Sequence, residues 1–196
     1  MKKDEGSRAM RHMTRVRHLI AVIGWRATMN PKRPASLPGK VSSEKGNFQL
    51  KIVKANQEHI KEVARLFDLY RQFYECEPDL ALATQFISDR TSRGESDIFV
   101  ALNADKASGF VQLYPSFCSV DAVKIYILYD LYVDADSRKT GLGEKLMNTA
   151  TDWAESNGAA RLDLLTADDN LAGQHLYEKL GYKKVLQDFY AYSLSV

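Results

Sequence analysis

The chain has 196 residues, of which 27 are Lys or Arg and 25 are Asp or Glu, so its formal net charge is only +2. This length predicts one globular domain with an additional segment, and the near-neutral balance gives no reason to expect a nucleic-acid partner. Two cysteines without metal-binding or redox spacing, Cys76 and Cys118, are typical of a reduced cytoplasmic protein and lead us to expect no bound metal.

The charge divides the chain at residue 46. Residues 1–46 contain 11 basic and 3 acidic side chains, a net charge of +8, whereas residues 47–196 contain 16 and 22, a net charge of −6. We therefore expect a basic, partly disordered N-terminal extension before an acidic domain. The acidic domain either favours a cationic substrate such as an amine or simply presents a solvated surface.

Three interpretations of the extension compete. It is a targeting or membrane-touching helix, a docking segment on a dimer partner, or a set of extra residues from an upstream start codon, with Met29 as the next candidate start. Its apolar run, residues 19–25, is far shorter than the roughly 20 residues that a membrane span needs. We favour the start-codon interpretation or a structural packing role, and we expect no membrane span.

The first part of the domain predicts strands and helices in sequence. We expect a strand at residues 48–54, a helix capped by Asn56 with apolar side chains at helical spacing up to Tyr74, and a second helix at residues 80–93. Two strands at residues 97–102 and 107–114 follow, joined by a turn at residues 103–106. The aromatic stretch 114–117 either closes a substrate pocket or forms a turn that packs on the domain.

Residues 125–133 form an apolar and aromatic run typical of a strand that is buried on both faces. Asp130 is the one carboxylate in this run. Because an unpaired buried charge is strongly unfavourable, Asp130 needs either partners or a chemical role.

A basic glycine turn follows this strand, with the sequence Arg138-Lys139-Thr140-Gly141-Leu142-Gly143. We expect the next helix to begin at about Thr140 and to end at Gly158. Glycines let backbone N–H groups point at an anion, and a helix N-terminus adds positive partial charge. The turn predicts either a phosphate site or simply a tight connection between strand and helix.

The last part of the chain predicts a strand at residues 161–166 and a short helix at residues 171–180. Asp169 and Asn170 supply the cap of that helix, and Gly181 ends it. Two further strands are expected at residues 182–185 and 189–194.

The strand, the R-x-x-G-x-G turn, the helix, the D-N cap and the L-Y-x-x-x-G-Y helix at residues 176–182 together resemble the GNAT superfamily of acetyl-coenzyme A dependent N-acetyltransferases, over residues 48–196. The resemblance implies an α/β fold with a mixed, mostly antiparallel twisted sheet of six to seven strands, about four flanking helices, and a homodimer. The motifs are most similar to the small polyamine, thialysine and histone-type amine acetyltransferases. In the polyamine branch two acidic residues stand at positions 129 and 130, whereas here only Asp130 is acidic.

The resemblance also implies which residues contact acetyl-coenzyme A. The backbone of residues 131–133 would pair with the pantetheine arm as if it were an added strand, and the glycine turn with Arg138 would hold the pyrophosphate. Tyr177 would act as the general acid that protonates the departing thiolate, unless it is only a core tyrosine. The implied cofactor-binding residues are Leu131, Tyr132, Val133, Arg138, Lys139, Thr140, Gly141, Leu142, Gly143, Glu144 and Asn170.

The acceptor amine must lose a proton before it can act as a nucleophile. An alkyl-ammonium has a pKa near 10.4, so it is almost entirely protonated at pH 7 and some group must help to take the proton. Asp130 is the candidate base, directly or through water, because burial raises the pKa of a carboxyl; it could equally only bind the ammonium or satisfy backbone groups.

We therefore expect an N-acetyltransferase that moves an acetyl group from acetyl-coenzyme A to a primary amine of a small molecule by direct transfer. Two alternatives stay open: acetylation of a protein lysine or N-terminus, and a non-catalytic domain that binds coenzyme A as a sensor.

Overall fold

The computed structural model describes residues 50–185 and 194–195. The extension expected at residues 1–46, and all but Leu194 of the strand expected at residues 189–194, lie outside this range. The described residues fall into two compact units that divide between Asp163 and Leu164, and each unit is described by itself.

The first unit is built on one sheet in which the strand order follows the chain, β1-β2-β3-β4-β5. Strands β1 to β4 are antiparallel neighbours, and helix α4 connects β4 to β5, as a connection between parallel neighbours requires. The strands are β1 (Lys51–Lys54), β2 (Asp97–Asn103), β3 (Lys106–Cys118), β4 (Val123–Val133) and β5 (Arg161–Leu164). The predicted α/β fold with a mixed, mostly antiparallel sheet is confirmed.

The described sheet has five strands rather than six to seven. Residues 182–185 form no strand. The physical reason lies in the preceding helix, because the N–H of Tyr182 donates to the carbonyl of Tyr177 at 3.0 Å and so completes the end of that helix instead of joining a sheet.

Four α-helices are described, as predicted, and two 3-10 turns accompany them. The helices are α2 (Ile60–Phe73), α3 (Leu80–Arg93), α4 (Leu142–Ser156) and α5 (Leu171–Lys179), and the turns are η1 (Gln57–His59) and η2 (Ala135–Ser137). Asn56 caps as predicted, although it caps η1, where its side chain accepts a hydrogen bond from the N–H of Glu58 at 3.0 Å. Helix α4 begins two residues later than expected, because Gly141 has a left-handed φ of 82° that a right-handed helix cannot include.

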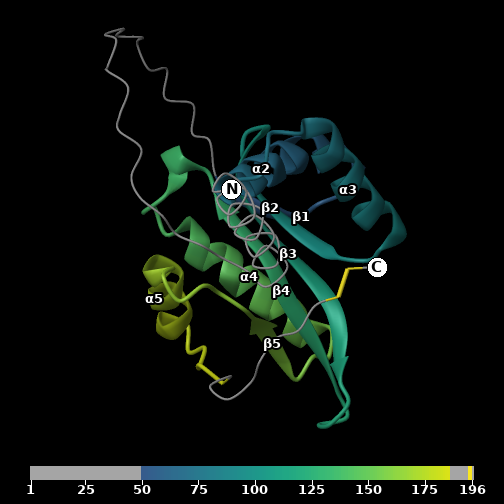
Figure 1. The fold of residues 1–196 in the computed structure, drawn as a ribbon, viewed down its shortest axis with the longest axis vertical. Helices are drawn as coiled ribbons and strands as arrows, with labels where there is room; N and C mark the ends of the chain where they lie inside the picture. Colours follow the sequence, from purple (N-terminus) through teal and green to yellow (C-terminus); the bar gives the residue numbers. More distant parts are fainter. Residues whose placement is uncertain (1–49, 186–193, 196) are drawn as a thin grey trace, which may run out of the picture. The chain divides into compact units, whose positions relative to one another are not determined.

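Consecutive residues of β3 face different helices. The ring of Phe110 lies 6.4 Å from that of Phe67 in α2, whereas Gly109 faces Leu142 and Leu146 of α4. Because neighbouring residues of a strand point to opposite faces, α2 and α4 cover opposite faces of the sheet (Figure 1). The core on the α2 side includes Val63, Leu66, Ile87, Ile98, Val100 and Phe110.

The stretch at residues 114–117 is part of a strand, so the interpretation as a turn is wrong, whereas its closing of a substrate pocket stays a prediction. Strand β3 continues through it to Cys118, and Tyr114 pairs with Ile127 of β4. Pro115 is compatible with this strand because the pairing of β3 with β2 ends at Leu113. Beyond that residue β3 has a partner strand on the β4 side only, and proline is tolerated in such an edge position.

Gly109 is required for close contact between β3 and α4. A Cβ atom there would lie 2.9 Å from the backbone oxygen of Tyr132 and 3.2 Å from Cδ1 of Leu146. We expect Gly109→Ala to lower the free energy of unfolding by about 1–3 kcal/mol, since overpacking against backbone forces β3 and β4 apart. Urea unfolding measures the change, with Ser116→Ala in the same strand as a control that stays within about 0.5 kcal/mol. If Gly109→Ala is as stable as the wild type, α4 and β4 shift to accommodate the added methyl group without a cost in stability.

Candidate active site

A β-bulge in β4 determines where Asp130 lies. Gln112 of β3 pairs with Asp130, but the next residue, Leu113, pairs with Leu128, so Tyr129 has no partner in the ladder. A bulge bends the strand and re-aims the side chains beside it. Tyr129 is accordingly 45% exposed and Asp130 only 8% exposed, so the strand expected to be buried on both faces opens to solvent at Tyr129.

Asp130 is a buried carboxyl that titrates near neutral pH. Burial raises its pKa from the ordinary 3.8 to about 7, and a hydrogen bond with Tyr70 of α2 partly opposes this increase. The Tyr70 hydroxyl also lies 3.4 Å from the backbone oxygen of Tyr129, so its single proton is shared between these two acceptors. A carboxyl with this pKa can hold or release a proton at neutral pH, which is the property that a general base needs.

Beside Asp130 lies a polar group of side chains that the sequence analysis did not identify. Gln112 is fully buried, and its Nε2 donates to Oγ of Ser96 at 2.8 Å and to Oη of Tyr114 at 2.9 Å. The ring of Tyr114 contacts the edge of Tyr129, with 5.2 Å between centroids. Burial, and then the charge of Asp130, raise the pKa of Tyr114. The signal in the sequence was a polar residue inside an apolar strand, but its pairing with Asp130 depends on the bulge.

The glycine turn presents donors to solvent. Lys139 and Gly141 have left-handed φ values of 62° and 82°, and the first turn of α4 has N–H groups without an acceptor inside the helix. Residues 138–141 are exposed. Nε of Arg138 donates to the backbone oxygen of Val133 at 3.0 Å, and the guanidinium lies 5.7 Å from the ring centroid of Tyr132. These features fit the binding of an anion.

Among the residues that the structure describes, the stretch Leu131, Tyr132 and Val133 of β4 pairs with a strand on one side only. It pairs with β3, whereas β5 has four residues and lies near Lys124, whose carbonyl accepts from the N–H of Ala160 at 2.9 Å. A strand this short extends roughly 13 Å, so it does not reach Leu131. The free side of these residues could pair with an extended ligand.

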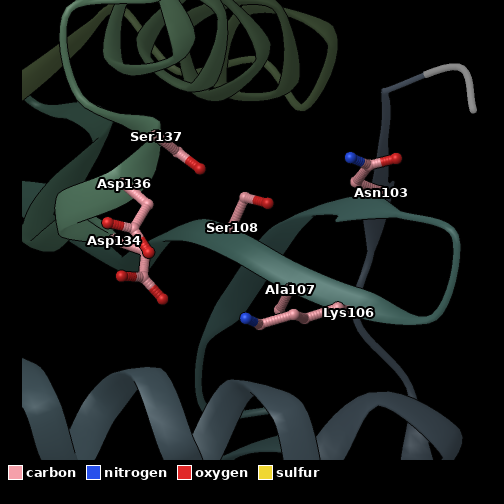
Figure 2. A pocket seen from close by; sticks show the side chains of 7 residues that line it. All are labelled: Asn103, Lys106, Ala107, Ser108, Asp134, Asp136 and Ser137. Atoms are coloured by element: carbon pink, nitrogen blue, oxygen red, sulfur yellow. The ribbon is translucent and has the colours of Figure 1, made fainter. Parts of the chain in front are cut away.

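A shallow pocket lies near the end of β4, but it does not contain the predicted site (Figure 2). Its lining is polar and includes the carboxylates of Asp134 and Asp136, and the carboxylate of Asp134 also lies 3.4 Å from the guanidinium of Arg65. Two carboxylates in the wall disfavour a pyrophosphate. The lining residues are Asn103, Lys106, Ala107, Ser108, Asp134, Asp136 and Ser137, none of which is a predicted site residue.

In the second unit, Asn170 caps α5 as predicted. Its Oδ1 accepts from the N–H of Gly173 at 3.1 Å, and its Nδ2 donates to Oγ1 of Thr166 at 2.8 Å. The residue is only 2% exposed. Its side chain therefore fixes the turn before α5, and its contact with the cofactor stays a prediction.

Tyr177, also in the second unit, is part of the end of α5. Gly181 has a left-handed φ of 89° and donates to the carbonyl of Glu178 at 3.1 Å, while Tyr182 donates to that of Tyr177. This is the Schellman arrangement, and the rings of Tyr177 and Tyr182 lie 6.1 Å apart. The Tyr177 side chain is 5% exposed and burial raises its pKa, so the phenol keeps its proton at neutral pH.

The structure thus places the predicted residues in two groups. Asp130, the strand residues 131–133 and the turn residues 138–144 follow one another along the first unit, while Asn170 and Tyr177 lie in the second unit. No helix in the described part of the chain is long and apolar enough to cross a membrane.

Comparison with known proteins identifies the family. Residues 63–182 match the Acetyltransferase (GNAT) family. The chain is 39% identical over 135 residues to the uncharacterized N-acetyltransferase YhfO of Bacillus subtilis (strain 168), covering 69% of this chain and 91% of that protein. It is 30% identical over 114 residues to a probable acetyltransferase of Haemophilus influenzae, covering 58% and 78%. A crystal structure of a probable acetyltransferase superposes with a TM-score of 0.69 at 35% identity, covering 74% of this chain and 97% of that one. The chain therefore belongs to the GNAT family of acetyltransferases.

Proposed function

We propose that the protein transfers an acetyl group from acetyl-coenzyme A to the primary amine of a small molecule, with both substrates bound together. The observation that carries the proposal is Asp130, a carboxyl buried at a β-bulge with a pKa of about 7. It directly precedes the one-sided stretch of β4, which leads into the basic glycine turn. Membership of the family indicates acetyl transfer, and the buried Asp130 carboxyl is a suitable base for an amine acceptor.

The described residues fit acetyl-coenzyme A, which would supply the acetyl thioester. The pyrophosphate would accept hydrogen bonds from the N–H groups of Lys139 to Glu144, with Arg138 and Lys139 supplying positive charge. The pantetheine arm would pair with the free side of Leu131 to Val133. Asn170, in the second unit, is a further proposed contact of acetyl-coenzyme A.

Each catalytic residue has a separate task. Asp130 takes the proton from the ammonium nitrogen, directly or through water, so that the nitrogen lone pair becomes available for attack on the carbonyl carbon. A backbone N–H of residues 131–133 stabilises the negative charge that develops on the carbonyl oxygen. As the bond between carbon and sulfur breaks, the Tyr177 hydroxyl would give its proton to the sulfur. The second proton that the nitrogen loses on becoming the amide would return to Tyr177 through solvent.

The surroundings of Asp130 support a small acceptor. The tyrosines Tyr70, Tyr114 and Tyr129 lie around it, and aromatic rings attract a compact cation through their faces. Polyamines, thialysine-type amines and free amino acids are the first candidates. A histone-type peptide is the alternative acceptor. The homodimer and the cytoplasmic location stay predictions.

Release of the coenzyme A thiol from acetyl-coenzyme A tests the proposal. The full-length protein is assayed against polyamines, lysine analogues, amino acids and histone-type peptides, each with a blank lacking the acceptor, while calorimetry measures binding of acetyl-coenzyme A. We expect binding, and release that depends on a small amine. Release with peptides alone would favour the protein acetyltransferase, and binding without release would favour the sensor. Absence of binding would contradict the phosphate role of the glycine turn.

A further inference from the structure

Gln112 has a buried amide oxygen that no described residue contacts. Its side chain is 0% exposed, and Oε1 has no hydrogen-bond partner in the described part of the chain. Its Nε2 already donates to Ser96 and Tyr114, so the orientation of the amide is fixed. A buried carbonyl without a hydrogen-bond partner is energetically costly. Such an oxygen is suited to a ligand that brings an N–H donor.

The location of Gln112 indicates which ligand this is. Gln112 pairs with Asp130 across the β3–β4 ladder, so the two side chains leave the sheet on the same face. This face therefore carries a carboxylate and an amide oxygen side by side, both of which accept hydrogen bonds. Tyr114 lies between Gln112 and the exposed Tyr129. Its hydroxyl accepts a hydrogen bond from Gln112, and its ring contacts the ring of Tyr129. A protonated primary amine, with three N–H donors and a positive charge, matches these two acceptors.

We propose that Gln112 determines acceptor specificity: its amide oxygen and the Asp130 carboxylate bind one ammonium group through two of its N–H bonds, which selects a primary alkyl-ammonium over N-alkylated amines. This inference rests on the proposed function and names the residue that distinguishes a primary amine from an N-alkylated one. Asp130 then removes a proton, while Gln112, which cannot accept one, keeps the nitrogen in place. Gln112 is thus a residue that binds and positions the acceptor.

The first test uses Gln112→Leu, which keeps the approximate size of the side chain and removes both polar atoms. With the amine that gives the highest thiol release, we expect the KM for the amine to rise about tenfold or more, because a hydrogen bond to a charged group is lost. The affinity for acetyl-coenzyme A should stay unchanged in calorimetry. Gln85→Leu makes the same substitution on the exposed side of α3 and should change neither quantity. Gln112→Met replaces Gln112→Leu if the latter does not fold, as judged by circular dichroism.

A second test changes the ligand instead of the protein. The N,N-dimethyl derivative of the same amine keeps its charge but has a single N–H, so it can satisfy only one of the two oxygens. As a competitive inhibitor of the wild-type enzyme it should bind about tenfold or more weakly than the parent amine, and this difference should shrink in Gln112→Leu.

The outcomes separate this inference from the proposed function. If the wild-type protein acetylates small amines, but Gln112→Leu and Gln112→Met keep the wild-type KM for the amine, the role of Gln112 is wrong and the function stands. Equal binding of the parent amine and its dimethyl derivative to the wild-type enzyme would also overturn it. If the wild-type protein acetylates no amine in the panel, the proposed function fails first, and this inference fails with it.

Discussion

Replacing Tyr177 with Phe is expected to lower kcat by about 10²–10⁴-fold, the usual contribution of a positioned general acid. The substitution removes only the hydroxyl that would protonate the departing thiolate. The backbone bonds that end α5, and the ring contact with Tyr182, do not need this hydroxyl. The hydroxyl also hydrogen-bonds Thr166, so we expect a loss of about 1 kcal/mol in stability, whereas the dissociation constant for acetyl-coenzyme A should change little. Steady-state kinetics with the best small amine, together with calorimetry, measure these quantities.

Tyr182→Phe is the matched control for this variant. It removes a hydroxyl from the neighbouring ring and keeps the ring itself, so we expect kcat to stay within about twofold of the wild-type value. If Tyr177→Phe turns over as fast as the wild type, Tyr177 is a core residue at the end of α5 and another group protonates the thiolate. If both variants lose activity equally, the packing of the ring pair is responsible and not the acid.

Replacing Asp130 with Asn is expected to lower kcat/KM for the amine by about 10²–10⁴-fold. Because the base must be ionised, the kcat/KM of the wild type should rise with pH through about 7, the pKa of Asp130. The variant should lack this rise and keep only the rise at higher pH that belongs to the amine itself. Asp105→Asn, in the exposed turn between β2 and β3, is the control and should keep the wild-type profile. A variant that keeps both activity and the rise near pH 7 would rule out Asp130 as the base.

The same substitution should increase stability at alkaline pH. Folding raises the pKa of Asp130 from 3.8 to about 7, so the folded protein binds this proton more tightly than the unfolded chain does. Stability is therefore lost as pH rises from about 4 to about 7, and the loss amounts to a few kcal/mol at most. Asn cannot ionise and avoids this loss. In urea unfolding, Asp130→Asn should exceed the wild type in stability at pH 8, and the difference should shrink toward pH 4. Lower stability at pH 8 would show that the carboxylate is well compensated in the fold.

Much of the architecture could be predicted from short-range sequence patterns alone. The order of strands and helices followed from apolar periodicity, and the caps at Asn56 and Asn170 followed from side chains that can accept from backbone N–H groups. Gly181 ended α5 as predicted because a left-handed residue is needed there. These features depend on residues within a few positions of one another, so the sequence alone was sufficient to predict them.

Features that depend on pairing between distant residues required the tertiary structure. The bulge at Tyr129 arises from the register between β3 and β4, and the spacing of side chains in β4 alone does not reveal a shift of one residue. That shift turns Asp130 inward, places it opposite Gln112 and exposes Tyr129. The extension of β3 through Pro115 likewise depends on where its pairing with β2 ends. The sequence by itself predicted the order of most helices and strands and named Asp130. Only the tertiary structure decided which side chains surround Asp130, because strand register is a property of two segments and not of one.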